Sequence, residues 1–381
     1  MSRHHRPAAV SERQHLSKAA HRDAEPTGRE SHPPGRAARL LVAFIVGEIA
    51  VIALYAALAH AATIGWPGND WDQAWYGARS WLAGGDAYAE VGPGRAHDWP
   101  WPLLYPMTSL LVVAPFAALP LAVARAAFVG LSAAILAYAL TRDGWHRLWV
   151  LAYGGFWSGI AAAQWSSLLT AAFLIPGLGW LAAAKPNIGV ALLAAARTRR
   201  QVAVIMLGGA LVLLASLALD PGWPVRWLAL IRASQHVRAP VSLGLGPIVL
   251  LGLLRWRRPE ARLLVALACV PQTTLLYETL PLALIAQTRV ESLGLALLSL
   301  LGQLGQTWAI LHTGGGFNAN TLATGQVLVI FCYLPALFLV LRRPNAGAAP
   351  APVEAALNRW HVPEWLAGDA PLREPERHSG F

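Results

Sequence analysis

The stretch LLVAFIVGEIAVIALYAALA, residues 40–59, decides the fold class of this chain. Glu48 is its single charged residue. An α-helix rises about 1.5 Å per residue, so about 20 apolar residues cross the ~30 Å hydrocarbon core of a bilayer. The stretch therefore predicts a transmembrane helix, which we place at residues 38–64.

The composition extends this prediction to the rest of the chain. The 381 residues are 56% hydrophobic and only 13% charged, with a mean hydropathy of +0.45, which is too apolar for an ordinary soluble domain. Further apolar runs lie at residues 103–119, 121–140, 145–160, 164–184, 202–219, 242–254, 262–277, 291–311 and 321–341, with shorter ones at 186–196 and 279–288. We expect an all-α polytopic membrane protein, a bundle of about 10 to 12 transmembrane helices, in which the two shorter stretches are re-entrant or complete spans.

The net charge of +10 has two explanations. In a soluble protein it would suggest nucleic acid, but in a membrane protein basic residues concentrate at cytoplasmic helix ends. Arginine clusters at 197–200, 255–262 and 342–343 all fit the cytoplasmic side if the N-terminus is also inside and both shorter stretches cross. We therefore expect a multi-pass protein of the inner (cytoplasmic) membrane and no nucleic-acid partner. This topology puts residues 65–102, 220–241 and 312–320 outside, together with the basic cluster at 142–147, which violates the rule.

The two ends of the chain differ from its middle. Residues 1–37 are rich in His, Arg, Ser and Pro and predict a disordered basic cytoplasmic arm. Residues 344–381 predict a disordered cytoplasmic tail, and residues 38–343 form the transmembrane domain. Both cysteines, Cys269 and Cys332, lie in apolar runs and are expected to be packing residues.

The outer loop 65–102 concentrates the polar chemistry. It holds five of the 11 acidic residues between positions 38 and 343, and six of the 17 tryptophans. An ordinary polar loop with interfacial tryptophans is the alternative, but it explains the two enrichments in one loop less well. The spacing of Trp71, Trp75, Ala78 and Leu82 predicts an amphipathic helix from Asp72 to Ala83, lying on the membrane surface and stopped by Gly84 and Gly85.

This helix would place Asp72 at the outer boundary of the membrane, a suitable position for a general base. Asp70 and Asp72 could instead hold a divalent cation between them. Two aspartates alone are a weak metal signal, and we expect no metal and no cofactor.

Polar residues inside apolar runs are functional candidates, because burying a charge in a membrane costs a few kcal/mol. Glu48, Gln164, Lys185 and Glu278 are of this kind. Glu48 is as easily an interhelical partner as a catalytic group. Lys185 begins the sequence KPNIG, where a proline breaks the helix, and we expect it to bind a phosphate. Basic residues of the outer loops, which could bind a phosphate or merely face lipid head groups, are Arg226, Arg232 and His312.

Taken in order along the chain, these residues resemble the GT-C membrane glycosyltransferases, most closely the polyprenyl-phosphate-mannose-dependent α-mannosyltransferases of glycosyltransferase family 87. The similarity covers roughly residues 38–341. Its motifs are matched here by Asp72, Tyr76, Ala78, Gly84 and Tyr88, then Tyr105-Pro106, Pro115 and Pro120, then Gln164 and Lys185-Pro186. Two departures stand out: Ala163 replaces the glycine that commonly precedes the glutamine, and the stretch from Gln164 to Lys185 is shorter than usual.

The resemblance implies an inverting transfer of a sugar from a polyprenyl-phosphate donor to a glycolipid or polysaccharide acceptor at the outer face of the membrane. It implies Asp72 as the base, with Asp70 as the fallback. The candidates for the donor phosphate are Lys185, which we prefer, Arg226, Arg232 and His312. The expected substrate-binding residues are Trp75, Tyr76, Tyr88, Tyr105 and Gln164. Mannose is the first choice of sugar and arabinofuranose the alternative.

Two other functional classes stay open on the sequence. A transporter or flippase for lipid-linked sugars would also use broken helices and a buried lysine. A non-catalytic membrane assembly factor would not depend on Asp72.

Overall fold

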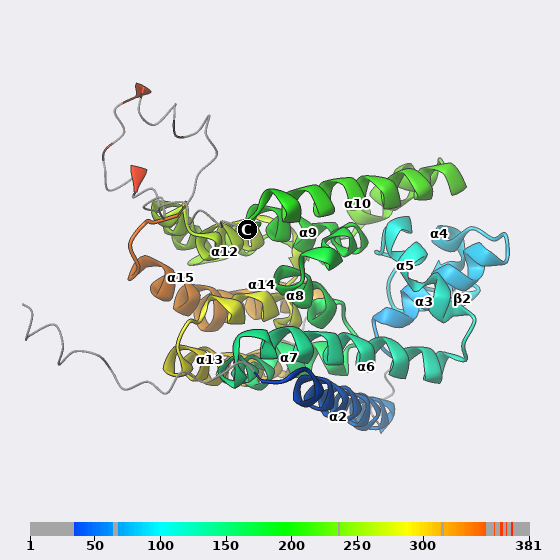
Figure 1. Cartoon of the computed structure of the whole chain (residues 1–381). Helices are drawn as coiled ribbons and strands as arrows, with labels where there is room; N and C mark the ends of the chain where they lie inside the picture. Colours follow the sequence, from blue (N-terminus) through cyan, green and yellow to red (C-terminus); the bar gives the residue numbers. More distant parts are fainter. Residues whose placement is uncertain are drawn as a thin grey trace, which may run out of the picture. The chain divides into compact units, whose positions relative to one another are not determined.

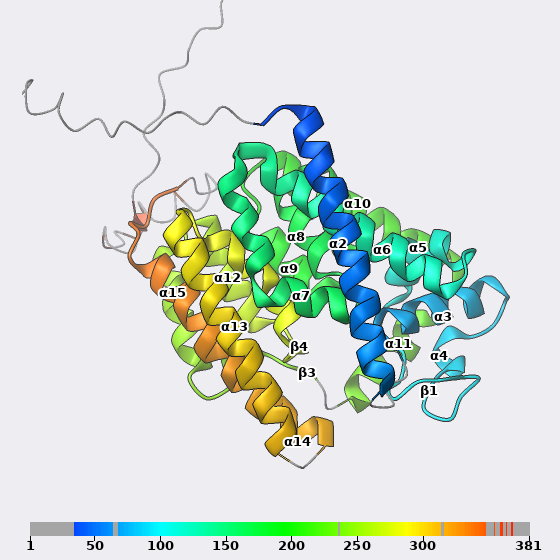
Figure 2. The same cartoon turned by 90° about the horizontal axis from the view of Figure 1, so that it is seen from below.

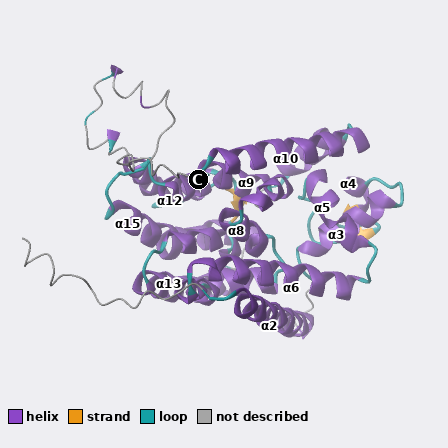
Figure 3. Cartoon of the chain, viewed as in Figure 1, coloured by secondary structure: helices purple, strands orange, loops and turns teal. Residues whose placement is uncertain are grey.

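The computed structural model describes residues 34–63, 68–234, 237–313 and 316–347, with a few single positions beyond 347. Most of the N-terminal arm and of the C-terminal tail expected from the sequence lies outside these residues. The described chain is almost entirely helical, with two short two-stranded sheets (Figure 3).

The first half of the chain contains, in order, α2 (Arg36–Thr63), α3 (Trp71–Leu82), α4 (Ala87–Glu90), β1 (Val91–Gly92), β2 (His97–Asp98), α5 (Met107–Ala117), α6 (Leu121–Leu140), the 3₁₀-helices η1 (Thr141–Asp143) and η2 (Trp145–Ala152), α7 (Gly154–Ala161), α8 (Ser166–Leu174), η3 (Pro176–Ala184, 3₁₀) and α9 (Pro186–Ala194).

The second half contains α10 (Arg199–Leu219), α11 (Trp223–Ala233), β3 (Val237–Arg238), the 3₁₀-helices η4 (Pro240–Ser242) and η5 (Gly246–Arg255), α12 (Pro259–Cys269), β4 (Gln272–Thr273), η6 (Leu276–Ile285, 3₁₀), α13 (Arg289–His312), α14 (Gly316–Leu328), the π-helical turn η7 (Val329–Tyr333) and α15 (Leu334–Leu341). Strands β1 and β2 pair in parallel and β3 and β4 antiparallel.

Five helical segments of the described chain are long and apolar enough to cross a membrane. They are α2, α6, α10, α13 and the continuous segment Thr321–Leu341. Their outward faces are apolar: on α10, for example, Leu207 and Leu211 are each 67% exposed. The all-α membrane class is thus confirmed, but the expected count of 10 to 12 spans is not.

Several predicted spans are broken into shorter helices. Residues 164–184 form α8 and η3, separated at Ile175, and residues 145–160 form η2 and α7. Prolines begin η3, α9 and α12, because a proline lacks the N–H needed to continue a preceding helix. Sequence hydropathy could not reveal these breaks, since the pieces are as apolar as a continuous span.

Helices α2 and α6 form an antiparallel pair (Figures 1 and 2). Arg39 donates to the carbonyl of Tyr138 at 2.9 Å, and Tyr55 donates to the carbonyl of Ala122 at 2.6 Å. Between these contacts Gly47 lies so close that a Cβ atom on it would be 3.0 Å from the Gly130 carbonyl oxygen. Small residues permit this approach, as in many membrane helix pairs.

The pairing corrects the predicted topology. A complete crossing at residues 103–119 would make α6 parallel to α2, whereas the two are antiparallel. Helix α5, with 11 residues or about 16 Å, is shorter than the ~30 Å hydrocarbon core of a bilayer. The basic cluster at 142–147 consequently follows the end of α6 that packs against the beginning of α2.

Two helical hairpins have both of their ends at the same end of the helix bundle. In the hairpin η3–α9, Pro176 and Ala195 lie at the two ends away from the turn and line the same small cavity. In the hairpin α12–η6, Arg262 near the outer end donates to the Ala194 carbonyl at 2.7 Å, and Ile285 at the other end accepts from Arg343 at 2.8 Å. The legs contain nine to 11 residues, too few for a 30 Å crossing. Residues 186–196 and 279–288 therefore form short legs of hairpins, and neither belongs to the five helical segments of the described chain that are long enough to cross a membrane.

The arginine clusters lie close together, at the ends of the hairpins away from their turns. Arg197 pairs with Glu260 at 2.9 Å, and Arg255 donates to the Arg343 carbonyl at 2.6 Å. These contacts join residues that are 63 and 88 positions apart in sequence, as expected if the clusters share one side of the membrane.

Helix α3 is present as predicted and ends at Leu82, with Gly84 at a φ of +83°. Its apolar face, which we expected to contact the membrane surface, packs inside the protein. Trp71 is fully buried and stacks on Phe128 of α6 at 4.9 Å, and Trp75 donates to the Phe116 carbonyl at 3.2 Å. The apolar face of α3 is covered by α5 and α6 rather than by lipid.

The α2–α6 contact predicts the effect of Gly47→Leu. The larger side chain cannot fit against the Gly130 carbonyl, so we expect the free energy of unfolding to fall by about 1–3 kcal/mol, measured as a lower thermal midpoint of the purified protein in detergent. Gly294→Leu in α13 is the matched control, because no atom lies within 4 Å of its Cβ position. Equal midpoints for the two variants would contradict the close packing of α2 and α6.

Candidate active site

A cavity in the described chain, called the main cavity below, has a volume of about 920 Å³, at the upper end of the range for ligand pockets. The tips of both hairpins, the loop before α3, the α7–α8 turn and α11 line it. Its apolar wall includes Trp101, Leu104, Val190, Trp227 and Ile231. The polar lining residues are Asp70, Gln73, Tyr105, Gln164, Lys185, Asn187, Gln272, Thr273, Thr274, Tyr277, Glu278, Thr321 and Thr324.

Asp70 is the carboxylate at the outer wall of this cavity. It immediately precedes α3, and its Oδ2 accepts hydrogen bonds from Gln164 Nε2 at 2.9 Å and from the Tyr277 hydroxyl at 3.3 Å. Burial raises the pKa of Asp70 above its ordinary value of 3.8, while the Gln164 hydrogen bond and the charge of Lys185 act in the opposite direction. A carboxylate with a raised pKa in a cavity is a candidate for proton transfer.

Gln164 connects Asp70 to the cation of the site. Its Nε2 donates to Asp70, and its Oε1 accepts from Lys185 Nζ at 3.1 Å and from Tyr105 at 3.5 Å. The preceding residue, Ala163, has a φ of +50°, a left-handed conformation that favours glycine. The glycine-to-alanine departure noted in the sequence therefore falls at a strained turn that directs Gln164 into the cavity.

Lys185 lies at the tip of the hairpin η3–α9. Its ammonium is 2.8 Å from Glu278 Oε1, 3.1 Å from Gln164 Oε1 and 5.2 Å from the centre of the Tyr277 ring. An ammonium has three donors, so these two oxygens leave one N–H for a ligand. Asn187, in the first turn of α9, also lines the cavity, where the partial positive charge of a helix N-terminus favours anions.

Glu278 completes the network from the second hairpin. Its Oε1 also accepts from Thr273 at 3.1 Å, and the side chain is 1% exposed. The sequence marked Glu278 as a charge in an apolar run but assigned it no role. Asp70, Gln164, Lys185 and Glu278, from four separate segments, thus form one connected polar group.

Asp72, the base expected from the sequence, does not line the cavity. Its Oδ1 accepts from Arg125 Nε at 2.7 Å, and its Oδ2 accepts from Arg125 Nη2 and from the Asn69 backbone N–H. This two-point ion pair fixes α3 to α6. Arg125 was missed, although it lies in the apolar run 121–140 and the rule that selected Lys185 would also have selected it.

Asp70 and Asp72 therefore do not converge on a common point, as a shared cation would require. Among the described residues, no group of three or more His, Cys, Asp or Glu side chains is arranged to hold a metal ion.

Other predicted residues lie away from the main cavity. Arg226 pairs with Asp220 and lies 3.4 Å from Asp86. His312 is exposed, and its ring stacks on Trp308 at 4.7 Å. Arg232 is also absent from the cavity lining.

Of the predicted substrate-binding residues, Tyr105 and Gln164 line the cavity, whereas Trp75, Tyr76 and Tyr88 do not. Tyr76 stacks on His97 at 4.5 Å. Tyr88 donates to the Tyr105 carbonyl at 3.2 Å. Tyr88 therefore supports Tyr105 from behind the cavity wall.

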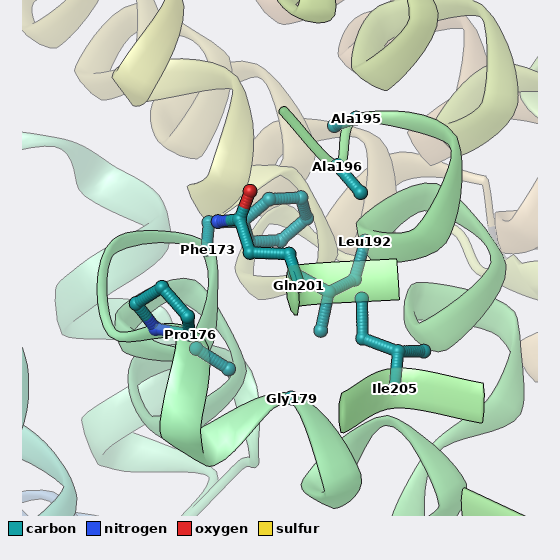
Figure 4. Close-up of a pocket in the computed structure, with 9 residues that line it drawn as sticks. Phe173, Pro176, Gly179, Leu192, Ala195, Ala196, Gln201 and Ile205 are labelled. Carbon is teal, nitrogen blue, oxygen red and sulfur yellow. The ribbon is translucent and has the colours of Figure 1, made fainter. Parts of the chain in front are cut away.

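A second cavity, between η3, α9 and α10, is too small to hold a substrate. Its volume is about 10 Å³, about the space needed for one water molecule. Figure 4 shows apolar side chains around it, with the amide of Gln201 as the polar group. It contains no titratable side chain.

Comparison with known proteins gives no independent assignment: no family model, curated protein or solved structure matches the chain.

The Asp72–Arg125 pair predicts a structural phenotype. Arg125→Met would leave Asp72, which is 1% exposed, as an uncompensated buried charge, so we expect the free energy of unfolding to fall by about 3 kcal/mol. The measurement is thermal unfolding in detergent. Arg197→Met is the control, since Arg197 is 60% exposed in its ion pair and such surface pairs contribute at most about 1 kcal/mol. A loss no larger than the control's would argue against a structural role for the pair.

Proposed function

We propose that this protein is a membrane glycosyltransferase that transfers a sugar from a polyprenyl-phosphate donor to a hydroxyl group of an acceptor, with Asp70 as the general base and Lys185 as the phosphate-binding cation. One observation carries the proposal: Asp70 and Lys185 face the same 920 Å³ cavity and are joined through the single amide of Gln164.

The division of the cavity supports a lipid-linked donor. Trp101, Leu104, Val190, Trp227 and Ile231 offer an apolar surface suited to a hydrocarbon chain. Polar residues on the hairpin tips, on the loop before α3 and on the α7–α8 turn are suited to the sugar and phosphate. A cavity of mixed polarity matches an amphipathic substrate better than a wholly water-soluble one.

The chemistry requires two groups that this network supplies. Asp70 removes the proton of the acceptor hydroxyl as its oxygen bonds to the anomeric carbon of the sugar. The bond from that carbon to the phosphate oxygen breaks, the electron pair stays with the phosphate, and the Lys185 ammonium stabilises the new charge. The sugar in the product has the anomeric configuration opposite to that in the donor. No metal takes part in this scheme.

The proposal moves the base from Asp72 to Asp70. Asp72 offers both oxygens to Arg125 and does not reach the cavity, so it has no free lone pair directed at a substrate. Asp70 has cavity exposure and a raised pKa. The similarity to family 87 favours mannose as the sugar and an outward-facing site, with arabinofuranose as the alternative donor.

A flippase for lipid-linked sugars is the competing function. Hairpins whose tips meet at a charged site are also used by transporters. Reconstituted vesicles distinguish the two: a flippase moves polyprenyl-phosphate sugar between leaflets without an acceptor, whereas the proposed enzyme forms a glycosidic product.

The base assignment is tested with Asp70→Asn. We expect transfer of radiolabelled sugar by the purified protein to fall by about 10²–10⁴-fold, the usual contribution of a general base. Asp98→Asn, in the same loop but outside the cavity lining, is the control and keeps wild-type turnover. The turnover of Asp72→Asn is measured per folded protein molecule, because this variant also loses an ion pair. If Asp72→Asn abolishes turnover while Asp70→Asn retains it, the assignment of the base is wrong.

The pH dependence tests the same group. Because Asp70 acts as a base only when deprotonated, the rate rises with pH through its raised pKa. Gln164→Leu removes a hydrogen bond that lowers this pKa, so the pKa rises further and the acidic limb of the pH–rate profile moves to higher pH. Gln303→Leu, outside the cavity lining, leaves the limb in place. If the acidic limb does not move in Gln164→Leu, the group that titrates in this limb is not Asp70.

A further inference from the structure

Two fully buried side-chain acceptors of the cavity-lining residues have no hydrogen-bond partner in the described part of the chain. They are Oε2 of Glu278 and Oε1 of Gln272. Both side chains are 1% exposed and belong to the hairpin α12–η6, on either side of its turn. Thr273, between them in sequence, donates to the other oxygen of Glu278 at 3.1 Å.

The remaining polar atoms of both side chains are already engaged. Glu278 Oε1 faces Lys185 at 2.8 Å. Gln272 Nε2 donates to the Leu267 carbonyl at 2.6 Å and to the Tyr333 hydroxyl at 3.0 Å. Rotating the Gln272 amide would place oxygen against the Leu267 carbonyl oxygen, so the unpaired atom is an acceptor. The two unpaired oxygens therefore require hydrogen-bond donors.

Buried acceptors without partners are rare in native proteins because they lose their hydrogen bonds to water. A ligand that supplies donors restores those bonds. The polyprenyl chain has no donors, and an ionised phosphate diester offers none. Sugar hydroxyls are donors, and the sugar of a lipid-phosphate donor is attached directly to the phosphate that Lys185 would bind. Glu278, in contact with Lys185, is therefore next to the position of that sugar.

We propose that Glu278 and Gln272 accept hydrogen bonds from hydroxyl groups of the donor sugar and so select the glycosylated lipid over the bare lipid phosphate. This inference rests on the proposed function and adds to it the residues that recognise the sugar. The same hairpin then supplies the carboxylate that holds Lys185 and the acceptors that bind the adjoining sugar.

Glu278→Gln is a sharp test, because one amide oxygen can keep the contact with Lys185 while the amide NH₂ replaces the unpaired oxygen. A donor then stands where the sugar needs an acceptor. The experiment uses the full-length protein in lipid nanodiscs and titrates polyprenyl phosphate and polyprenyl-phosphate mannose separately. Trp101 and Trp227 line the cavity, so their fluorescence reports binding.

The measured quantity is the ratio of the two dissociation constants, in which any change in phosphate affinity common to both lipids cancels. We expect wild-type protein to prefer the mannosylated lipid and Glu278→Gln to reduce that preference about tenfold or more. Gln272→Met, which keeps the Lys185–Glu278 pair, is a second variant and also reduces the ratio. Glu260→Gln, at the outer end of α12, keeps the wild-type ratio.

The outcomes separate this inference from the proposed function. If wild-type protein transfers sugar but both variants retain the full preference for the mannosylated lipid, sugar recognition by Glu278 and Gln272 is overturned and the proposed function stands. If wild-type protein binds neither lipid and forms no product, the proposed function fails and this inference fails with it.

Discussion

Charged and polar groups in apolar surroundings need partners inside the protein, and one network meets this need at the centre of the structure. The Lys185 ammonium pairs with Glu278, and Gln164 hydrogen bonds both Lys185 and Asp70. Each of these side chains comes from a different segment, so the position of each segment depends on the others. Backbone groups at the two hairpin tips also have partners from other segments: Ser109 donates to the Ala184 carbonyl, and Gln306 donates to the Thr274 carbonyl at 2.8 Å.

The fold was predictable where the signal is local. The run 121–140 matches α6 at both ends, and the first span differs from α2 by only one or two residues. The hairpins were not predictable, because an apolar run of about ten residues reads the same whether it crosses or returns. Their direction is decided by tertiary contacts, such as Arg262 with Ala194 and Arg343 with Ile285. The antiparallel direction of α2 and α6 likewise depends on side chains distant in sequence.

The residues of the candidate site were also predictable only in part. Gln164 and Lys185 were found because polar residues inside apolar runs are costly unless they have a role. Asp70 and Asp72 could not be separated on the sequence, since they are two residues apart and equally acidic. The deciding partner, Arg125, lies 53 residues beyond Asp72. Glu278 was visible as an anomaly, but its place beside Lys185 follows from the arrangement of two hairpins.

The span of sequence that the network bridges has a consequence for biosynthesis. The hydrogen bond between Tyr277 and Asp70 joins residues 207 positions apart. A nascent chain that has reached α11 already contains Asp70, Gln164 and Lys185, but not the carboxylate that pairs with the lysine. The cavity can close only after the hairpin α12–η6 has been synthesised and has entered beside α9. Completion of the site is therefore a late step of assembly, and the same step supplies the carboxylate that pairs with Lys185.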